Sequence, residues 1–201
     1  MQIVTSTQVS AVILAGGMGR RMGGQDKGRI RFRGRPMIEW ILNAISPQVE
    51  NILINANRNQ EEYARYGYPV CSDQLEGYQG PLAGFAAAMM ASDTPYIVTL
   101  PCDGPFVTPD LVSRMLRAMN HDNADIVVAH DGQRLQPVYA LLATHLLPDL
   151  ERFLATGERK IDRWYAQQRM ALVDFSDAQQ MFTNINTPED RQQLQGEALS
   201  K

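Results

Sequence analysis

The fold is decided by residues 9–17, Val9-Ser10-Ala11-Val12-Ile13-Leu14-Ala15-Gly16-Gly17. The apolar run predicts a short buried strand, and the alanine and two glycines that follow predict a loop at its end. Similar apolar runs alternate with helical patterns over the first 120 residues or so of the chain. That alternation predicts an α/β fold, a Rossmann-like, doubly wound and mostly parallel sheet with helices on both faces.

Further apolar runs and helix signals extend this pattern along the chain. The expected strands span residues 9–14, 49–55, 69–72, 96–101, 125–129, 137–142, 170–175 and 181–185. The expected helices span residues 36–45, 60–66, 80–90, 108–119, 145–154 and 160–167, and Thr187-Pro188-Glu189-Asp190 is expected to cap a final helix. No repeat, low-complexity tract or linker divides the chain, so residues 1–201 are expected to form a single domain.

Composition limits the classes of partner. The 201 residues are 44% hydrophobic and 20% charged, which is typical of a soluble globular protein. A net charge of −3 argues against nucleic acid or anionic lipid as partners. No apolar stretch reaches the ~18–20 residues of a membrane span, and the polar start of the chain does not resemble a signal peptide. Cys71 and Cys102 are too far apart for a CxxC metal site. We therefore expect a cytoplasmic protein.

The loop after the first strand combines glycine with positive charge. Residues 14–27, LAGGMGRRMGGQDK, hold five glycines together with Arg20, Arg21 and Lys27. Glycine lets backbone N–H groups approach a bulky anion, and arginine and lysine supply charge to phosphate oxygens. The loop matches neither the GxxxxGK[ST] phosphate motif nor the GxGxxG dinucleotide motif. The combination predicts a cradle for a triphosphate, the alternative being a flexible loop with solvated arginines.

Polar residues stand where the expected strands end. Ligands of parallel sheets bind beyond the carboxyl ends of the strands, so the loops after Leu14, Ile54 and Leu100 are expected to meet at one site. Asp103 follows the 96–101 strand. Because Mg²⁺ prefers one or two carboxylates together with phosphate oxygens and water, Asp103 is the first candidate for a metal ligand. The alternative is an aspartate that only forms a turn before Gly104-Pro105.

A series of motifs resembles a known family. These motifs are Leu14-Ala15-Gly16-Gly17, Asn55-Ala56-Asn57-Arg58, Gly80-Pro81-Leu82-Ala83-Gly84, Pro101-Cys102-Asp103 and Asn184-Ile185-Asn186-Thr187-Pro188-Glu189. With RRMGG and DK in the first loop, the series resembles the nucleotidyltransferases that activate sugars and cofactors. Within that group it is most similar to the molybdenum cofactor guanylyltransferases. The resemblance covers nearly the whole chain, in the family's order.

The resemblance implies a fold of the nucleotide-diphospho-sugar transferase type and transfer of GMP from GTP to the phosphate of molybdopterin, with Mg²⁺ as cofactor and pyrophosphate as product. It agrees with a catalytic role for Lys27, Arg21 and Asp103. The expected nucleotide-binding residues are Leu14, Ala15, Gly16, Gly17, Lys27, Asn55, Asp73, Gly80 and Asp103. Asn184 and Asn186 are assigned to the acceptor, and Arg159 is placed where it can meet acceptor phosphate. The chain departs from many relatives at Gly104, where a hydroxyl or another polar residue is expected.

Other interpretations of these residues and of the activity stay open. Asn55 and Asp73 can simply cap strands, Gly80 can simply start a helix, and Arg159 can be solvated. An enzyme that uses CTP, a sugar-1-phosphate nucleotidyltransferase and a non-catalytic GTP-binding delivery module are the rival activities. The LAGG and GPLAG segments favour GTP, and the paired asparagines favour the pterin. We expect a monomer, with a molybdenum-insertion protein and target-enzyme chaperones as partners by family analogy.

Overall fold

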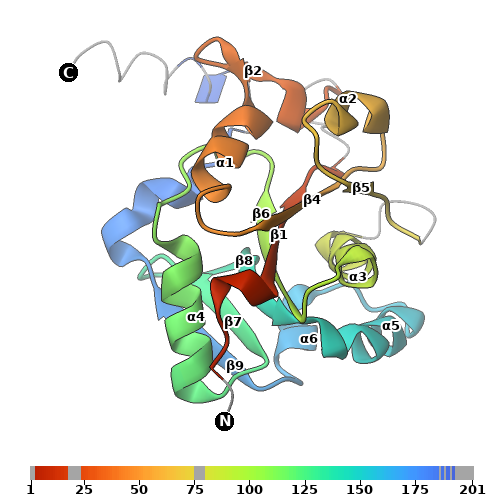
Figure 1. The fold of residues 1–201 in the computed structure, drawn as a ribbon, viewed down its shortest axis with the longest axis vertical. Coiled ribbons are helices and arrows are strands. Elements are labelled where there is room, and N and C mark those ends of the chain that lie inside the picture. Colours follow the sequence, from red (N-terminus) through yellow and green to blue (C-terminus); the bar gives the residue numbers. More distant parts are fainter. Residues whose placement is uncertain are drawn as a thin grey trace.

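One seven-stranded sheet organises the protein (Figure 1). The computed structural model describes residues 3–17, 24–74, 80–185, 187, 189–190 and 192. The strand order is β5-β4-β1-β6-β8-β7-β9. The strands are Val9–Leu14 (β1), Asn51–Asn55 (β4), Val70–Cys71 (β5), Tyr96–Pro101 (β6), Ile126–His130 (β7), Leu135–Ala143 (β8) and Met170–Asp174 (β9). Only β8 runs antiparallel to its neighbours, β6 and β7, so the expected mostly parallel sheet is confirmed.

Helices cover both faces of this sheet. The α-helices are Met37–Ile45 (α1), Gln60–Ala64 (α2), Pro81–Ala91 (α3), Leu111–Asp122 (α4), Leu147–Ala155 (α5) and Ile161–Tyr165 (α6). Short 3₁₀ helices span Ser6–Gln8 (η1), Lys27–Arg29 (η3), Thr144–Leu146 (η4) and Ser176–Phe182 (η5). None of the helices in the described ranges is both long and apolar enough to cross a bilayer.

The alternation of side chains along the strands creates two hydrophobic layers. On β1, Val9, Ala11 and Ile13 join a buried cluster with α1 and α4, whereas Val12 joins a cluster with α3, α5 and α6. Successive strand residues point to opposite faces, so a strand buried on both sides is apolar throughout. The doubly wound architecture expected from the sequence is therefore confirmed, and Figure 1 shows the two sets of helices on opposite sides of the strands.

A small hairpin was missed because its strands are too short to show a period. It consists of Arg31–Phe32 (β2) and Arg35–Pro36 (β3), and it leads directly into α1. Helix α4 begins at Leu111 rather than at residue 108 as expected. Residues 108–111 form a turn instead, in which the N–H of Leu111 donates to the carbonyl of Thr108.

The strand expected at residues 181–185 is wrong. Its first part belongs to η5, and residues 183–185 form neither strand nor helix. The apolar residues Met181 and Ile185 are buried, but side-chain and loop contacts replace a strand ladder. The Tyr139 hydroxyl donates to the carbonyl of Met181 at 3.0 Å, and the N–H of Ile185 donates to the carbonyl of Asp103 at 2.9 Å. The pattern therefore recorded burial correctly but not backbone conformation.

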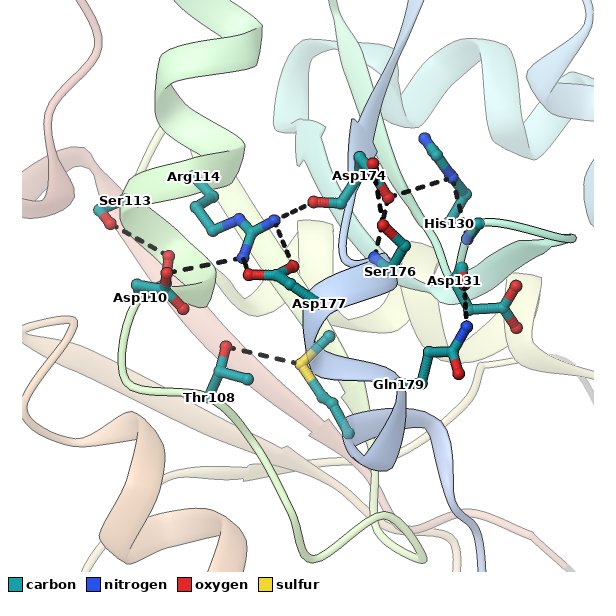
Figure 2. A network of polar contacts seen from close by, with 12 residues as sticks. Thr108, Asp110, Ser113, Arg114, His130, Asp131, Asp174, Ser176, Asp177 and Gln179 are labelled. Atoms are coloured by element: carbon teal, nitrogen blue, oxygen red, sulfur yellow. Dashed lines mark hydrogen bonds and ion pairs between the residues drawn. The ribbon is translucent and has the colours of Figure 1, made fainter.

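A polar network fixes η5 against α4, as Figure 2 shows. Arg114 of α4 forms an ion pair with Asp177 at 3.0 Å and donates a hydrogen bond to the carbonyl of Asp174. Its guanidinium also lies 4.1 Å from the centre of the Phe175 ring.

Beyond η5, the expected cap at Thr187 is confirmed, because its hydroxyl accepts from the N–H of Asp190 while the Asp190 carboxylate accepts from the N–H of Thr187.

Candidate active site

Four parallel strands end level with one another, and this edge of the sheet forms the base of the site. In the register of the sheet, Leu14 pairs with Asn55 on one side and with Pro101 on the other, and Asn55 pairs with Cys71. The N–H of Ala15 donates to the carbonyl of Asn55, and the N–H of Cys102 donates to the carbonyl of Leu14. The loops after these strands therefore meet, as the sequence predicted.

Lys27 and Asp103 come together across this edge. Lys27 Nζ lies 2.8 Å from Asp103 Oδ2, and the two side chains are only 22% and 12% exposed. Lys27 is delivered by η3 after the glycine-rich loop, while Asp103 follows β6. The sequence placed both residues at this site but did not predict their contact, and the structure joins them in a partly buried ion pair. Asp103 Oδ1 has no hydrogen bond or ion pair to any residue that the structure describes.

A second polar cluster lies where β4 and β5 end. Asn55 Nδ2 donates to Asp73 Oδ1 at 3.0 Å, and Asn57 Nδ2 donates to Asp73 Oδ2 at 2.8 Å. Asn57 Oδ1 in turn accepts from the N–H of Asp73. Since both asparagines donate to Asp73, they fix its carboxylate in one orientation. The structure therefore brings the two predicted nucleoside residues, Asn55 and Asp73, into direct contact.

Two glycines allow the backbone to approach this cluster closely. A Cβ at Gly16 would lie 2.8 Å from Asn57 Nδ2, and a Cβ at Gly84 would lie 2.8 Å from Asn55 Oδ1. Gly80 precedes α3 with φ of 80°, a left-handed conformation that favours glycine. The LAGG and GPLAG segments thus lie on either side of the same asparagine, although they are about 65 residues apart in sequence. Gly17 is exposed at the start of the loop.

The segment that carries Asn184 lies beside Asp103. The N–H of Ile185 donates to the Asp103 carbonyl, and a Cβ at Gly104 would lie 3.4 Å from Asn184 Oδ1. The same Cβ would lie 2.2 Å from the Tyr139 hydroxyl oxygen. Gly104 is therefore the residue that fits, because Tyr139 fills the space in which a polar side chain at position 104 was expected.

Known proteins resemble this chain over its length. A family model described as MobA-like NTP transferase domain matches residues 11–171. The chain belongs to this family. Two relatives are named molybdenum cofactor guanylyltransferase. The one from Shewanella sediminis is 53% identical over 98% of this chain and 100% of its own length. The one from Shewanella halifaxensis is 52% identical over 97% of each chain. A crystal structure of molybdopterin-guanine dinucleotide biosynthesis protein A from Archaeoglobus fulgidus is 25% identical, with a TM-score of 0.79 over 96% of this chain and 100% of that one.

Some residues that the sequence predicted for this MobA-like site lie outside the described part of the chain or make contacts of another kind. Arg21 and Asn186 lie outside the described residues. Arg159 lies between α5 and α6, where its Nη1 donates to the carbonyls of Leu154 and Glu158 at 2.7 Å each. Its role toward an acceptor stays a prediction. The strand expected at residues 181–185, which includes Asn184, is absent from the described residues.

Several residues of this MobA-like site were not predicted from the sequence. Asp26 is buried and accepts hydrogen bonds from Asn59 and from the Tyr63 hydroxyl. Burial raises the pKa of Tyr63, so the phenol stays protonated and donates. Arg58 holds the two ends of the glycine-rich loop. Asn57 and Arg58 belong to a motif that was recognised only as a resemblance, and Tyr63 gave no signal because its partner is 37 residues away.

The side chains at this edge of the sheet fit a magnesium ion that is coordinated partly by the protein and partly by the substrate. Among the described residues, no group of three or more His, Cys, Asp or Glu side chains forms a ready metal cage. Mg²⁺ commonly takes one or two carboxylates and completes its shell with water and substrate phosphate. Asp103, with Oδ1 available beside the Lys27 ion pair, has the chemistry for that arrangement.

Proposed function

We propose that this chain transfers GMP from GTP to the terminal phosphate of molybdopterin and releases pyrophosphate. Two lines of support converge on this activity. The full-length relatives at 52–53% identity carry the name molybdenum cofactor guanylyltransferase. The observation that carries the proposal within this chain is the Lys27–Asp103 ion pair of 2.8 Å, located where the glycine-rich loop meets the end of β6.

The proposed chemistry is an in-line displacement. An oxygen of the acceptor phosphate bonds to the α-phosphorus of GTP, and the bond from that phosphorus to the bridging oxygen of pyrophosphate breaks. The acceptor phosphate is already an anion at pH 7, so no strong general base is needed. The barrier comes from repulsion between anions and from charge on the leaving group. Lys27 and the N–H groups of the loop are suited to neutralising that charge.

A magnesium ion is proposed at Asp103. Its carboxylate would hold the ion, and the bound ion would supply a Lewis acid for the phosphate oxygens. In the structure as described, Asp103 Oδ2 is engaged by Lys27. The lysine therefore positions one carboxylate oxygen and keeps a positive charge within reach of the polyphosphate. Arg21, outside the described residues, is proposed to add charge to the same place.

The nucleoside is proposed to bind over the other half of the edge. Asn55 is 2% exposed, offers a donor and an acceptor, and lies between the backbones of Gly16 and Gly84. Asp73, held by Asn55 and Asn57, is suited to accept hydrogen bonds from ribose hydroxyls or from the edge of guanine. Asn184 is proposed to serve the acceptor, since its segment is bound to the backbone of Asp103.

The cellular setting is also proposed. The protein would act in the cytoplasm as a monomer, without nucleic acid or membrane. The acceptor would be exchanged with a molybdenum-insertion protein and with chaperones of the target enzymes. Family analogy alone supports these partners.

Mass analysis of a defined reaction tests the activity. Purified protein is incubated with molybdopterin, Mg²⁺ and either GTP or CTP, and the products are separated. The expected result is the guanine dinucleotide of molybdopterin together with stoichiometric pyrophosphate from GTP, and little product from CTP. A preference for CTP would reverse the assignment of the nucleotide. GTP binding with no pyrophosphate under any condition would instead identify a delivery module.

A further inference from the structure

The segment of residues 55–59, Asn-Ala-Asn-Arg-Asn, contacts both halves of the site. Its fourth residue, Arg58, donates to three backbone carbonyls of the glycine-rich loop. Nη1 donates to Gly24 at 2.7 Å, and Nη2 donates to Gln25 at 2.9 Å and to Gly17 at 3.2 Å. Gly17 precedes the central part of the loop, and Gly24 and Gln25 follow it. A single guanidinium therefore connects the two ends of the loop.

The neighbours of Arg58 in this segment contact the two carboxylates that frame the site. Asn57 donates to Asp73, on the side proposed for the nucleoside. Asn59 donates to Asp26 at 2.9 Å, and Asp26 directly precedes Lys27. Asn59 adopts φ of 52°, a left-handed conformation that asparagine tolerates better than most residues. In the turn after β4, Asn57, Arg58 and Asn59 therefore contact three different parts of the site. These are Asp73, the glycine-rich loop and Asp26.

The hydrogen bonding of Arg58 suggests that its geometry is specific. Its Nε is buried and has no hydrogen-bond partner in the described part of the chain. An unsatisfied buried N–H is unfavourable and is rare in native proteins. Nε therefore lacks a hydrogen bond in the arrangement in which Nη1 and Nη2 donate to three carbonyls. A planar fork of fixed donors can span such a set, whereas the single ammonium of lysine cannot reproduce it.

We propose that Arg58 is a positioning residue for the triphosphate. By holding Gly17 at a fixed separation from Gly24 and Gln25, it pre-organises the two described ends of the loop, and with them Lys27, to receive the polyphosphate. It does not itself act on the nucleoside, which is bound through other residues. This inference rests on the proposed function, because it assumes that the loop binds the phosphates of GTP.

The test compares ligands that differ only in their phosphates. Arg58→Gln removes the charge and the fork, and Arg58→Lys keeps the charge but removes the fork. The control is Arg65→Gln, since the Arg65 side chain is 71% exposed and its ion pair is with Glu62, three residues earlier. Calorimetry measures the affinity of each protein for GTP and for guanosine, the pyrophosphate assay measures kcat and KM, and thermal unfolding checks the fold.

Arg58→Gln is expected to weaken GTP binding about tenfold and to lower kcat by up to about 10²-fold, because a misplacement on the order of 1 Å has effects of that size. Guanosine affinity should stay within about twofold of the parent value. Arg58→Lys is expected to show an intermediate loss, and Arg65→Gln none.

Three results would overturn the proposal. The first is unchanged GTP affinity in Arg58→Gln, and the second is an equal loss of GTP and guanosine affinity. The third is full activity in Arg58→Lys, which would show that charge alone matters. If Arg58→Gln does not fold, Arg58→Lys still decides between charge and fork. Failure of the parent protein to bind GTP would instead count against the proposed function, so the two failures are distinguishable.

Discussion

Replacing Gly104 by alanine is expected to destabilise the fold, because position 104 has no space for a side chain. The added Cβ would lie 2.2 Å from the Tyr139 hydroxyl oxygen, far inside van der Waals contact. Tyr139 is only 2% exposed, and its hydroxyl donates to the carbonyl of Met181 at 3.0 Å. The ring can therefore yield only by moving a packed side chain and breaking a buried hydrogen bond.

The size of the effect follows from these contacts. Overpacking typically costs about 1–3 kcal/mol, and leaving a buried carbonyl without its donor costs a similar amount. We expect Gly104→Ala to lower the free energy of unfolding by about 2–3 kcal/mol. Tyr139→Phe alone should lower it by about 1–2 kcal/mol, since the Met181 carbonyl loses its partner. In the Tyr139→Phe background, the nearest ring atom lies at 3.5 Å, an ordinary contact. Adding alanine there should be nearly neutral.

Urea unfolding of the four proteins gives a double-mutant cycle, and pyrophosphate release reports on the site. The double variant should be more stable than Gly104→Ala alone, with a coupling of more than about 1 kcal/mol. Turnover should fall in Gly104→Ala and partly recover in the double variant, because Asn184 and Asp103 flank the contact. Free-energy changes that add to within about 0.5 kcal/mol would refute this account of the packing.

Two further predictions concern charge at the site, and one concerns pH. Asp103→Ala should lower turnover by about 10²–10³-fold, since the substitution removes the proposed metal ligand and the partner of Lys27. Near-normal pyrophosphate release would remove the metal assignment. Lys27→Ala should lower both turnover and GTP affinity, which calorimetry measures, and an effect on neither would exclude Lys27 from phosphate binding. Stability should fall as pH rises past about 9, because burial raises the pKa of a thiol and three phenols, so the folded protein keeps protons that the unfolded chain releases. These groups are Cys102, Tyr63, Tyr139 and Tyr165. Urea midpoints that stay constant from pH 7 to 10.5 would contradict this.

Local patterns predicted the elements of the sheet well where burial and backbone period agree. Strands β1 and β6 have the predicted bounds, because each is an apolar run buried on both faces and closed by glycine or proline. The pattern failed at residues 181–185, where Met181 and Ile185 are buried but the backbone pairs with no strand. The position of apolar residues indicates which side chains are buried, but it does not indicate what the backbone groups bond to.

The candidate site was predicted in part for a similar reason. Residues proposed to bind a ligand at strand ends, such as Asn55 and Asp103, follow apolar runs and are visible in the sequence. Residues that hold those residues in place are not visible, because their partners are distant in sequence. The contact of Arg58 with Gly17 spans 41 positions, and that of Tyr63 with Asp26 spans 37. No local pattern encodes such a pair.

The sequence by itself determined the layered α/β architecture and the chemical types at the strand ends, since both depend on hydrophobic period and on glycine, which act locally. Tertiary structure alone decided which carboxylate meets Lys27, why position 104 is glycine, and how Arg58 joins the two ends of the loop. These depend on the register of β1 between β4 and β6 and on the path of residues 181–185. Both are set by the packing of segments remote along the chain.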